Sequence, residues 1–191
     1  MNKVIAQEVL FEAKKILEDL EIPFFLIYGS CLGAVREGKI LECDTDIDLG
    51  IYLEDLQPNY CKMKEAFEAN GFKAFGFSYP YREPRSLNIY KYDILIDIRG
   101  FEKWEGGRFL QIVDSNRIDR ADVYSFKDVE PIEFCGKEFM APSPVETYIE
   151  ENYGKDWKTP DPEMHFSYAT KHGWWEKLGR STIINAEEIK R

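Results

Sequence analysis

The chain has 191 residues, a formal net charge of −10, 44% hydrophobic residues and 31% charged residues. This composition excludes a fibrous or disordered chain and predicts an ordinary globular protein, most simply one domain with a sizeable core. The acidic balance argues against a general nucleic-acid binder, which needs clustered lysine and arginine. It leaves nucleotide substrates open, because a bound metal ion supplies positive charge locally.

Signals of a membrane or secreted protein are not evident in the sequence. The first residues lack the apolar segment of a signal peptide, and no stretch approaches the roughly 20 apolar residues that span a bilayer. The four cysteines have no Cys-x-x-Cys spacing and there are only two histidines, so we do not expect a zinc site. We expect reduced thiols and a cytoplasmic location.

The chain begins with an amphipathic segment. Over residues 4–20 apolar side chains recur at helical spacing with charged residues between them, which predicts a helix packed against a sheet. Pro23 ends this helix, and the apolar residues 24–28 predict a buried strand.

The strand should stop at Gly29 and Ser30. Glycine allows close backbone approach, and serine suits the cap of a short helix over residues 31–36. Backbone N–H groups at such a strand-to-helix junction are unpaired and point outward, so this turn is a candidate phosphate-binding site.

After a loop over residues 37–45, the residues 46–53 alternate between polar and apolar side chains and predict a second strand. Asp46 and Asp48 then share one face of that strand, about 7 Å apart. Two carboxylates so close repel each other unless a cation joins them, and Mg²⁺ with a nucleotide phosphate is a common partner. The alternative is an exposed acidic strand face.

These residues resemble a known family. Gly-Ser followed by Asp-x-Asp on the next strand is similar to the nucleotidyltransferase superfamily, which includes DNA polymerase β. More narrowly, the sequence resembles the LicD/fukutin family through two strings, YGSCLGAVREG at residues 28–38 and CDTDID at residues 43–48. The family's usual tryptophan and middle aspartate are here Cys43 and Thr45, whereas Asp44 stands in place together with the Asp-x-Asp pair.

Further along, residues 60–70 are helical by composition, with Gly71 as the C-terminal cap, and residues 72–78 read as a strand. The prolines of residues 79–85 predict a turn or an exposed loop. Residues 87–98 are strand-like, either as a hairpin or as one long bent strand.

A third site carboxylate is expected near the end of the strand-like stretch 87–98. The resemblance places it at Asp97, although Arg99 and Gly100 replace the family's aromatic residue and proline. Asp93 is the rival candidate. We prefer Asp97 because a loop follows it directly, as in the family motif, while a solvent-facing aspartate on an edge strand remains the alternative for either.

The last part of the body reads as a loop over residues 101–122, a hairpin over residues 131–140 and a helix that ends near Tyr153. Ser143 and Glu146 should form a capping box at the start of this helix, with proline between them at the first helical position. The string YIEENYGKDWKTP at residues 148–160 again resembles the LicD/fukutin pattern.

The C-terminal tail contains both histidines, His165 and His172, next to Trp174 and Trp175. This cluster could form a lip of an acceptor site, but a segment that docks on the body is the commoner arrangement. We expect residues 1–162 to form a LicD-like domain and residues 163–191 an extension packed on it. The expected fold class is α+β, a nucleotidyltransferase-like fold with a small mixed sheet and helices mainly on one face.

The resemblance implies a chemistry for the acidic residues. Asp46 and Asp48 would bind one or two Mg²⁺ ions, with Mn²⁺ as the alternative ion. Asp97 would complete the second metal position or accept a proton from the attacking hydroxyl. Phosphoryl-type transfer needs mainly charge neutralisation and positioning, which such a site provides.

The resemblance also implies a phosphate-binding region. Gly29 and Ser30 would hold the donor phosphates, and Arg36 is a candidate phosphate clamp because a guanidinium binds two oxygens at once. An ion pair of Arg36 with Asp44 or Glu42 is the structural alternative. Asp44 would hold the loop or the outer shell of the metal.

Three functions are compatible with these features. The first is a LicD-like transferase that moves a phospho-alcohol, such as phosphocholine, from a CDP-linked donor to a sugar or glycan acceptor. The second is a nucleotidyltransferase that attaches a nucleotide to a small molecule, and the third is an inactive binding module. The chain is short for an enzyme that recognises its acceptor alone, so a protein partner could complete the acceptor site.

Overall fold

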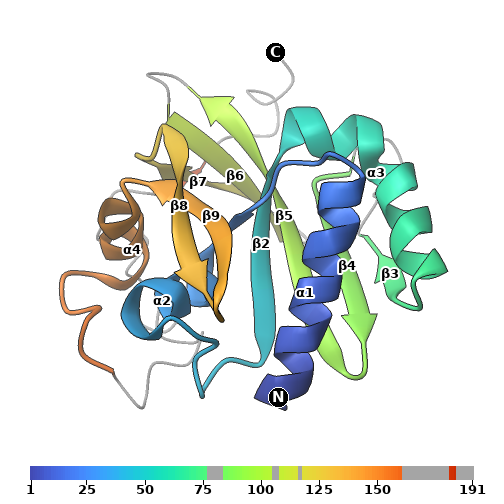
Figure 1. Cartoon of the computed structure of the whole chain (residues 1–191). Helices are drawn as coiled ribbons and strands as arrows, with labels where there is room; N and C mark the ends of the chain where they lie inside the picture. Colours follow the sequence, from blue (N-terminus) through green and yellow to red (C-terminus); the bar gives the residue numbers. More distant parts are fainter. Residues whose placement is uncertain (77–83, 105–107, 116–117, 161–180, 184–191) are drawn as a thin grey trace.

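The computed structural model describes residues 1–76, 84–104, 108–115, 118–160 and 181–183. Helices and strands alternate along the first half of the described chain, and strands dominate the second half (Figure 1). In chain order the elements are α1 (Lys3–Asp19), β1 (Phe25–Leu26), α2 (Tyr28–Glu37), β2 (Asp46–Tyr52), α3 (Leu53–Ala69), β3 (Lys73–Phe75), β4 (Ser86–Lys91), β5 (Ile94–Trp104), β6 (Arg108–Ser115), β7 (Ile118–Tyr124), β8 (Asp128–Phe134), β9 (Lys137–Ser143), α4 (Val145–Tyr153) and β10 (Ser181–Ile183).

A mixed sheet forms the centre of the molecule, with the strand order β1-β2-β5-β4-β3. Only the central pair of this sheet, β2 and β5, is parallel, and the other pairs are antiparallel. The far end of β5 pairs with β6 and continues into an antiparallel ribbon of β6, β7 and β10. The chain is therefore an α+β protein, as the sequence predicts.

Helices α1 and α3 lie side by side against one face of the mixed sheet (Figure 1). This face is apolar, and its centre is the run Ile94, Ile96 and Ile98 of β5, which is almost completely buried. Lys91 marks the edge of the same face, where its ammonium group binds Glu12 of α1. The opposite face of β2 and β5 carries the aspartates, because successive side chains of a strand point to opposite sides.

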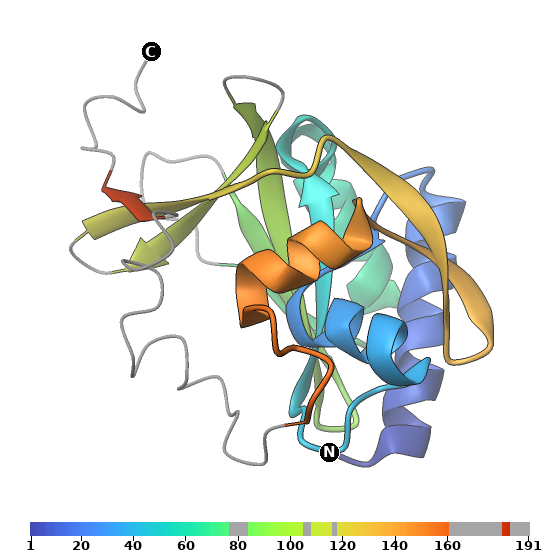
Figure 2. The ribbon, with the colours of Figure 1, turned by 90° about the vertical axis from the view of Figure 1, so that its left-hand side faces the viewer.

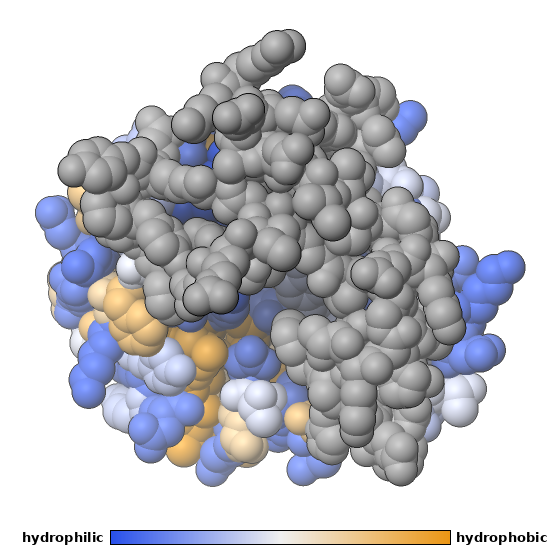
Figure 3. Space-filling model, turned by 180° about the vertical axis from the view of Figure 1, so that it is seen from behind, coloured by the Kyte–Doolittle hydropathy of each residue, from blue (hydrophilic) through white to orange (hydrophobic). Residues whose placement is uncertain are grey.

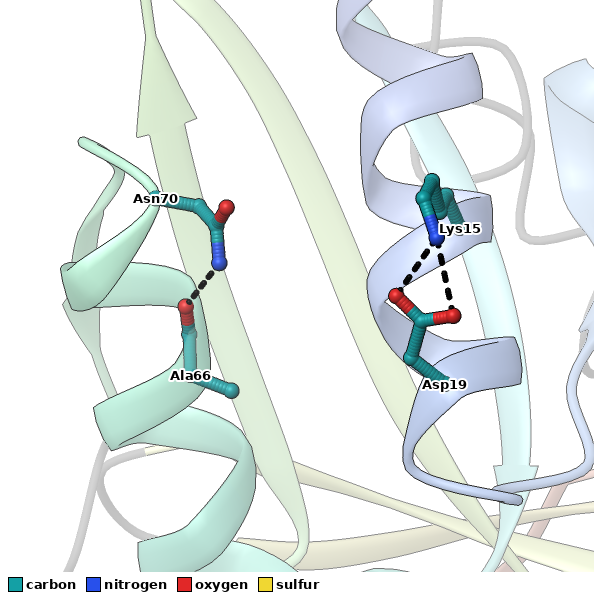
Figure 4. A network of polar contacts seen from close by, with 4 residues as sticks. All are labelled: Lys15, Asp19, Ala66 and Asn70. Atoms are coloured by element: carbon teal, nitrogen blue, oxygen red, sulfur yellow. Dashed lines mark hydrogen bonds and ion pairs between the residues drawn. The ribbon is translucent and has the colours of Figure 1, made fainter.

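Helix α1 forms as expected, and Asn2 caps its start. The Asn2 side-chain oxygen accepts hydrogen bonds from the backbone N–H groups of Val4 at 3.1 Å and Ile5 at 3.3 Å. Near its end, Lys15 binds Asp19 one turn later, and at the end of α3 the Asn70 side chain donates to the Ala66 carbonyl (Figure 4). Such local contacts stabilise helix ends modestly.

Helix α3 begins seven positions earlier than the sequence predicts. It starts at Leu53 and includes Pro58, which we expected to precede the helix. Proline removes one backbone hydrogen bond from a helix interior. Leu53 and Leu56 are buried in the core, and this burial outweighs that loss. Gly71 follows the helix with φ +80°, as a C-terminal glycine should.

The expected loop over residues 101–122 is wrong. The described residues there belong to the end of β5, to β6 and to most of β7. The loop prediction rested on the charges and glycines of this stretch. Antiparallel strands tolerate charged residues on a side that faces water, so charge does not exclude a strand.

Residues 84–98 form a hairpin rather than one bent strand. Strands β4 and β5 are antiparallel, and Tyr92 and Asp93 make the turn between them with φ values of +50° and +61°. The second expected hairpin is also present as β8 and β9, with Cys135 and Gly136 at its turn. The four cysteines all fall in the described ranges and are free.

Helix α4 runs to Tyr153 as predicted, but its cap differs from the expected capping box. Ser143 is the last residue of β9, and its hydroxyl donates to Glu130 of β8 at 2.8 Å. The other Glu130 carboxylate oxygen accepts the backbone N–H of Val145 at 3.0 Å. A carboxylate from a neighbouring strand thus replaces the local cap, which helical sequence rules do not detect.

Helices α2 and α4 pack against each other beside the hairpin β8–β9, while the ribbon of β6 and β7 projects away from them (Figure 2). Of the tail, the structure describes only β10, which pairs with β7. His165, His172, Trp174 and the turn at residues 79–83 lie outside the described residues, and the division at residue 162 stays a prediction.

The hydropathy of the helices was compared with that of a membrane span in the described part of the chain. None of the helices there is both long and apolar enough to cross a bilayer. Viewed from behind, the coloured surface shows a small area of hydrophobic residues among hydrophilic ones (Figure 3).

Candidate active site

The candidate site is built around the first turn of α2, which begins at Tyr28, three positions earlier than expected. The Tyr28 backbone N–H stands at the start of the helix, where no intrahelical acceptor precedes it, and donates to the hydroxyl of Tyr148 on α4 at 3.2 Å. A second phenol contact joins Tyr28 to Tyr124 at 3.1 Å between the hydroxyl oxygens. Helix α2 is therefore anchored by residues about 100 positions further along the chain.

Ser30 does not cap α2, in contrast to the sequence prediction. Its side chain is 3% exposed, and its hydroxyl oxygen accepts the backbone N–H of Asp48 at 2.9 Å. Ser30 already lies inside the helix, so its hydroxyl is directed to the neighbouring strand instead of to the helix start. The bond fixes the position of α2 relative to β2.

Gly29 provides the close approach that the sequence indicated, but to a protein group. A side chain at this position would place its Cβ 3.0 Å from the nearer carboxylate oxygen of Asp44. The Asp44 carboxylate therefore lies directly against the first turn of α2. Lys3 holds the same loop, since its ammonium group donates to the Asp44 carbonyl at 2.7 Å.

The register of β2 and β5 brings two carboxylates together. Asp48 is paired with Asp97 across these parallel strands, so both side chains lie on the same face of the sheet. Asp46 lies two residues before Asp48 on this face, opposite Leu95. Asp93, the rival of Asp97, lies in the β4–β5 turn and is exposed.

The carboxylates of the site repel one another. Burial raises the pKa of Asp48 well above its usual value, and the charges of Asp46, Asp97 and Asp44 raise it further. Burial also raises the pKa of Asp97, while the guanidinium of Arg99 opposes this shift. Metal-free, the site therefore has an excess of negative charge.

The two outer carboxylates behave in the same way. Burial raises the pKa of Asp44 to about 6; Lys3 and Arg36 lower it, and Asp46 raises it. The pKa of Asp46 is raised by burial as well. Every aspartate of the site is thus easier to protonate than an aspartate in water, because burial disfavours the charged form.

The donor types fit a magnesium ion, although the side chains do not form a finished ligand set. Within the described ranges, one carboxylate oxygen of Asp44 and one of Asp97 are buried without a hydrogen-bond partner. The other oxygen of Asp97 binds the Arg99 guanidinium. No three metal-ligating side chains are grouped to hold an ion in the part that the structure describes. Carboxylate oxygens and excess negative charge are nevertheless what Mg²⁺ prefers.

Arg36 lies in the last turn of α2, with its side chain 13% exposed. It forms an ion pair with its neighbour Glu37 at 3.1 Å, and neither of the expected partners, Asp44 and Glu42, makes an ion pair with it among the described residues. Its charge still lowers the pKa of Asp44. Its Nε is buried with no partner in the described structure, so this guanidinium retains a donor.

The family assignment follows from a comparison of the whole sequence. Residues 21–144 match the model of the family described as LicD/FKTN/FKRP, nucleotidyltransferase domain. This chain belongs to the LicD/FKTN/FKRP family. The matched region contains α2, β2 and the part of β5 that carries Asp97.

Named relatives support the LicD/FKTN/FKRP assignment. The ribitol-5-phosphate transferase FKTN of Mus musculus is 32% identical over 166 residues, which cover 81% of this chain and 33% of that protein. The ribitol 5-phosphate transferase FKRP of Homo sapiens is 51% identical over 41 residues, or 22% of this chain and 8% of that protein. The chain spans about a third of the length of its FKTN relatives.

Solved nucleotidyltransferases share the fold. The lincosamide antibiotic adenylyltransferase LnuA, bound to lincomycin, superposes with a TM-score of 0.52 and 14% identity over 89% of this chain and 94% of that one. ANT(2")-Ia, in complex with adenylyl-2"-tobramycin, superposes with a TM-score of 0.50 and 16% sequence identity over 90% of this chain and 85% of that one. At this identity the likeness concerns the fold alone.

Several residues of this LicD-family site escape sequence reasoning. Lys3 and Arg99 are ordinary surface cations by pattern, and only the fold brings them to Asp44 and Asp97. Tyr148 and Tyr153 belong to the string at residues 148–160 that resembles the family pattern, but this resemblance does not reveal their roles. Burial raises the pKa of Tyr153 well above its usual value, and the charges of Asp48 and Asp44 raise it further, which indicates that its phenol lies near these carboxylates.

Proposed function

We propose that the chain is the catalytic domain of a metal-dependent transferase of the LicD type. It moves a phospho-alcohol group, such as ribitol phosphate or phosphocholine, from a CDP-linked donor to a sugar or glycan acceptor. The observation that carries this proposal is the pairing of Asp48 with Asp97 on adjacent parallel strands, beside the first turn of α2. Relatives described as ribitol-5-phosphate transferases support the class of transferred group.

Asp46 and Asp48 would hold the metal, most simply Mg²⁺. When bound, the ion neutralises charge on the donor phosphates and on the leaving group. The protein's own part is to keep the carboxylates in place. Ser30 does this for Asp48 through its hydrogen bond to the strand backbone.

The transfer step needs one new bond and one broken bond. The acceptor hydroxyl oxygen attacks the donor phosphorus that carries the alcohol. The bond from this phosphorus to the oxygen of CMP breaks, and CMP leaves. Asp97 accepts the proton of the attacking hydroxyl through the carboxylate oxygen that Arg99 does not bind. Burial raises the pKa of Asp97 and so makes it a better base than a free carboxylate.

The donor phosphates would lie at the first turn of α2, where backbone N–H groups favour anions. The Asp44 carboxylate occupies the neighbourhood of Gly29. Two like charges cannot share this place, so donor binding requires Asp44 to be protonated, to move or to contact the metal. The unpartnered Nε of Arg36 gives the phosphate region a further donor in the described structure.

A nucleotidyltransferase is the second candidate, and the fold shared with adenylyltransferases favours it. The two reactions differ in their products. The LicD-type transfer releases a nucleoside monophosphate, whereas attachment of a nucleotide from a triphosphate releases pyrophosphate. An inactive binding module would release neither.

The test incubates the protein with CDP-ribitol, CDP-choline or CTP and a panel of sugars, with Mg²⁺ or with EDTA. We expect CMP from a CDP-linked donor, only with Mg²⁺, and no CMP from the Asp48→Asn protein. Pyrophosphate from CTP would instead support the nucleotidyltransferase. If the sugar panel lacks the true acceptor, thermal shift measurements with the same nucleotides still report donor binding. The absence of a shift with any nucleotide would support the inactive binding module.

A further inference from the structure

A row of four side chains crosses the aspartate face of the sheet. Asp48 on β2 is in register with Asp97 on β5, Asp97 with Asn88 on β4, and Asn88 with Phe75 on β3. Residues in register on adjacent strands point to the same face. The row therefore leads from the carboxylates, across Asn88, to the edge of the sheet.

Asn88 and Asp97 each present an oxygen that lacks a donor. In the described structure, the side-chain oxygen of Asn88 and one carboxylate oxygen of Asp97 are buried without a hydrogen-bond partner. Their Cα atoms face each other across antiparallel strands, a separation of about 4.5–5.5 Å. Buried acceptors without partners are costly, and a ligand hydroxyl that donates to either oxygen would remove that cost.

Beyond Asn88 the same face carries two aromatic rings. Phe75 and Tyr90 stack with centroids 5.3 Å apart and an interplanar angle of 18°. Phe75 is 46% exposed, so part of its ring is open to a ligand at the edge of the sheet. The stacked pair presents an apolar surface next to the two acceptor oxygens.

The two ends of the row differ in chemistry. On the β2 side, Ser30 and the first turn of α2 suit a phosphate. On the β4 side, the described residues present acceptor oxygens and aromatic rings, which repel a phosphate but suit hydroxyl groups and the apolar face of a ring. Asp97 lies between the two sides, where a proton must pass from acceptor to base.

We propose that Asn88, Tyr90 and Phe75 form the acceptor subsite and that it binds the ring of a sugar. The hydroxyl that attacks the donor donates to Asp97, a neighbouring hydroxyl donates to Asn88, and the C–H face of the ring packs on the aromatic pair. The inference rests on the proposed function and assigns one side of its site. Asn88 is a positioning residue, because it orients the acceptor without receiving the transferred group.

The test measures sugar and donor binding separately with the full chain. Saturation-transfer NMR uses methyl glycosides of galactose, glucose and mannose, and ribitol, as probes, and calorimetry with CDP-ribitol and CDP-choline in Mg²⁺ measures the donor. The variants are Asn88→Leu, Phe75→Leu and Tyr90→Leu. Tyr90→Phe keeps the ring, and Tyr92→Asn changes an exposed aromatic in the adjacent turn.

We expect at least one glycoside to bind the unmodified protein through its ring protons. Asn88→Leu and Tyr90→Leu should weaken this binding about tenfold, the usual effect of one lost hydrogen bond or ring contact. Tyr92→Asn should bind as the unmodified protein does, and Tyr90→Phe, which keeps the ring, should restore most of the binding that Tyr90→Leu loses. Donor affinity should be the same in all variants.

Three results would overturn the subsite: no glycoside binding to the unmodified protein, equal binding to Tyr90→Leu, or an equal loss of donor and glycoside affinity. The last would mark Asn88 and the aromatic rings as a donor-base site or as structural. Failure of every protein to bind a CDP-linked donor counts against the proposed function. The glycoside measurements do not depend on the donor, so they distinguish a failure of the proposed function from a failure of the acceptor subsite.

Discussion

Burial and like charge act on the same side chain at Asp48. It is 9% exposed, and Asp46, Asp97 and Asp44 are close enough to raise its pKa. A group arranged in this way lowers the stability of the metal-free fold and is explained by function more readily than by structure. In the sequence, the alternation of Asp46 and Asp48 with apolar residues predicts strand β2.

Replacement of Asp48 by asparagine should separate activity from stability. Transfer should fall by at least about 10²-fold, the scale for removal of one charged group from a transition-state site. The free energy of unfolding at pH 7 should be unchanged or higher, because repulsion is relieved. CMP release and urea unfolding measure the two effects.

Asp93→Asn is the matched control, since Asp93 lies in an exposed turn whose positive φ suits asparagine. It should change neither quantity. A large loss of stability in Asp48→Asn would show that this aspartate is structural, and the transferase assignment would lose its main support.

Asp44 should give the metal-free protein a distinct pH dependence. Its folded pKa is raised from 3.8 to about 6, so in this interval the folded state binds more protons than the unfolded state. Stability therefore decreases as the pH rises from about 4 to 6 and is not recovered above it. Asp44→Asn should remove this part of the decrease, about 1–3 kcal/mol after allowance for solvent screening.

Urea unfolding at several pH values in EDTA measures the difference between the two proteins. The other site aspartates contribute a decrease of the same sign to both, so only the difference is attributed to Asp44. Parallel stability curves for Asp44→Asn and the unmodified protein would contradict the assignment.

At the scale of elements, side chains from distant segments determine where helices begin. The glycine-serine string predicts a helix near residue 31, but Ser30 binds β2 and Tyr148 receives the first free N–H of α2. Helix α4 similarly depends on Glu130 from β8. Sequence rules detect only local caps, which explains both errors.

Ser30→Ala should loosen the contact between α2 and β2. The buried N–H of Asp48 would lose its partner, at a cost of about 1–3 kcal/mol in the free energy of unfolding. Chemical denaturation measures this loss. Ser125→Ala removes an exposed hydroxyl and should change stability by less than about 0.5 kcal/mol. Equal stability of the two variants would show that the Ser30 bond has no net value.

Glu130→Ala should destabilise the start of α4. The N–H of Val145 and the Ser143 hydroxyl both lose their acceptor, and loss of a cap costs about 0.5–2 kcal/mol. Glu130→Gln, which keeps one oxygen, should lose less. Glu133→Ala, on the same strand and exposed, serves as the control, and a loss of equal size there would rule out a capping role.

For the whole molecule, local patterns sufficed where an element is long or alternating, as in α1, β2 and the hairpin β8–β9. They failed for β6 and β7, whose pairing depends on β5. The choice between Asp93 and Asp97 illustrates the limit, because only the β2–β5 register brings Asp97 to Asp48. The family match confirms the resemblance of the strings at residues 28–38 and 43–48, whereas the string at residues 148–160 lies outside residues 21–144 and stays a prediction.

Magnesium should stabilise the entire fold. An ion that binds only the folded state at 100 times its dissociation constant adds about 2.7 kcal/mol, and thermal unfolding with Mg²⁺ or EDTA measures the effect. The Asp48→Asn protein should show little of it. An equal shift in that variant would place the ion elsewhere.

Strand β5 changes partners along its length. Residues Ile94–Phe101 have neighbours on one or both sides within the mixed sheet, whereas Glu102, Lys103 and Trp104 pair with β6. Asp97 belongs to the doubly held part, between Asp48 and Asn88. Changes in the length or tilt of the ribbon therefore need not displace Asp97, because the residues that hold Asp97 in the mixed sheet are separate from those that pair with β6.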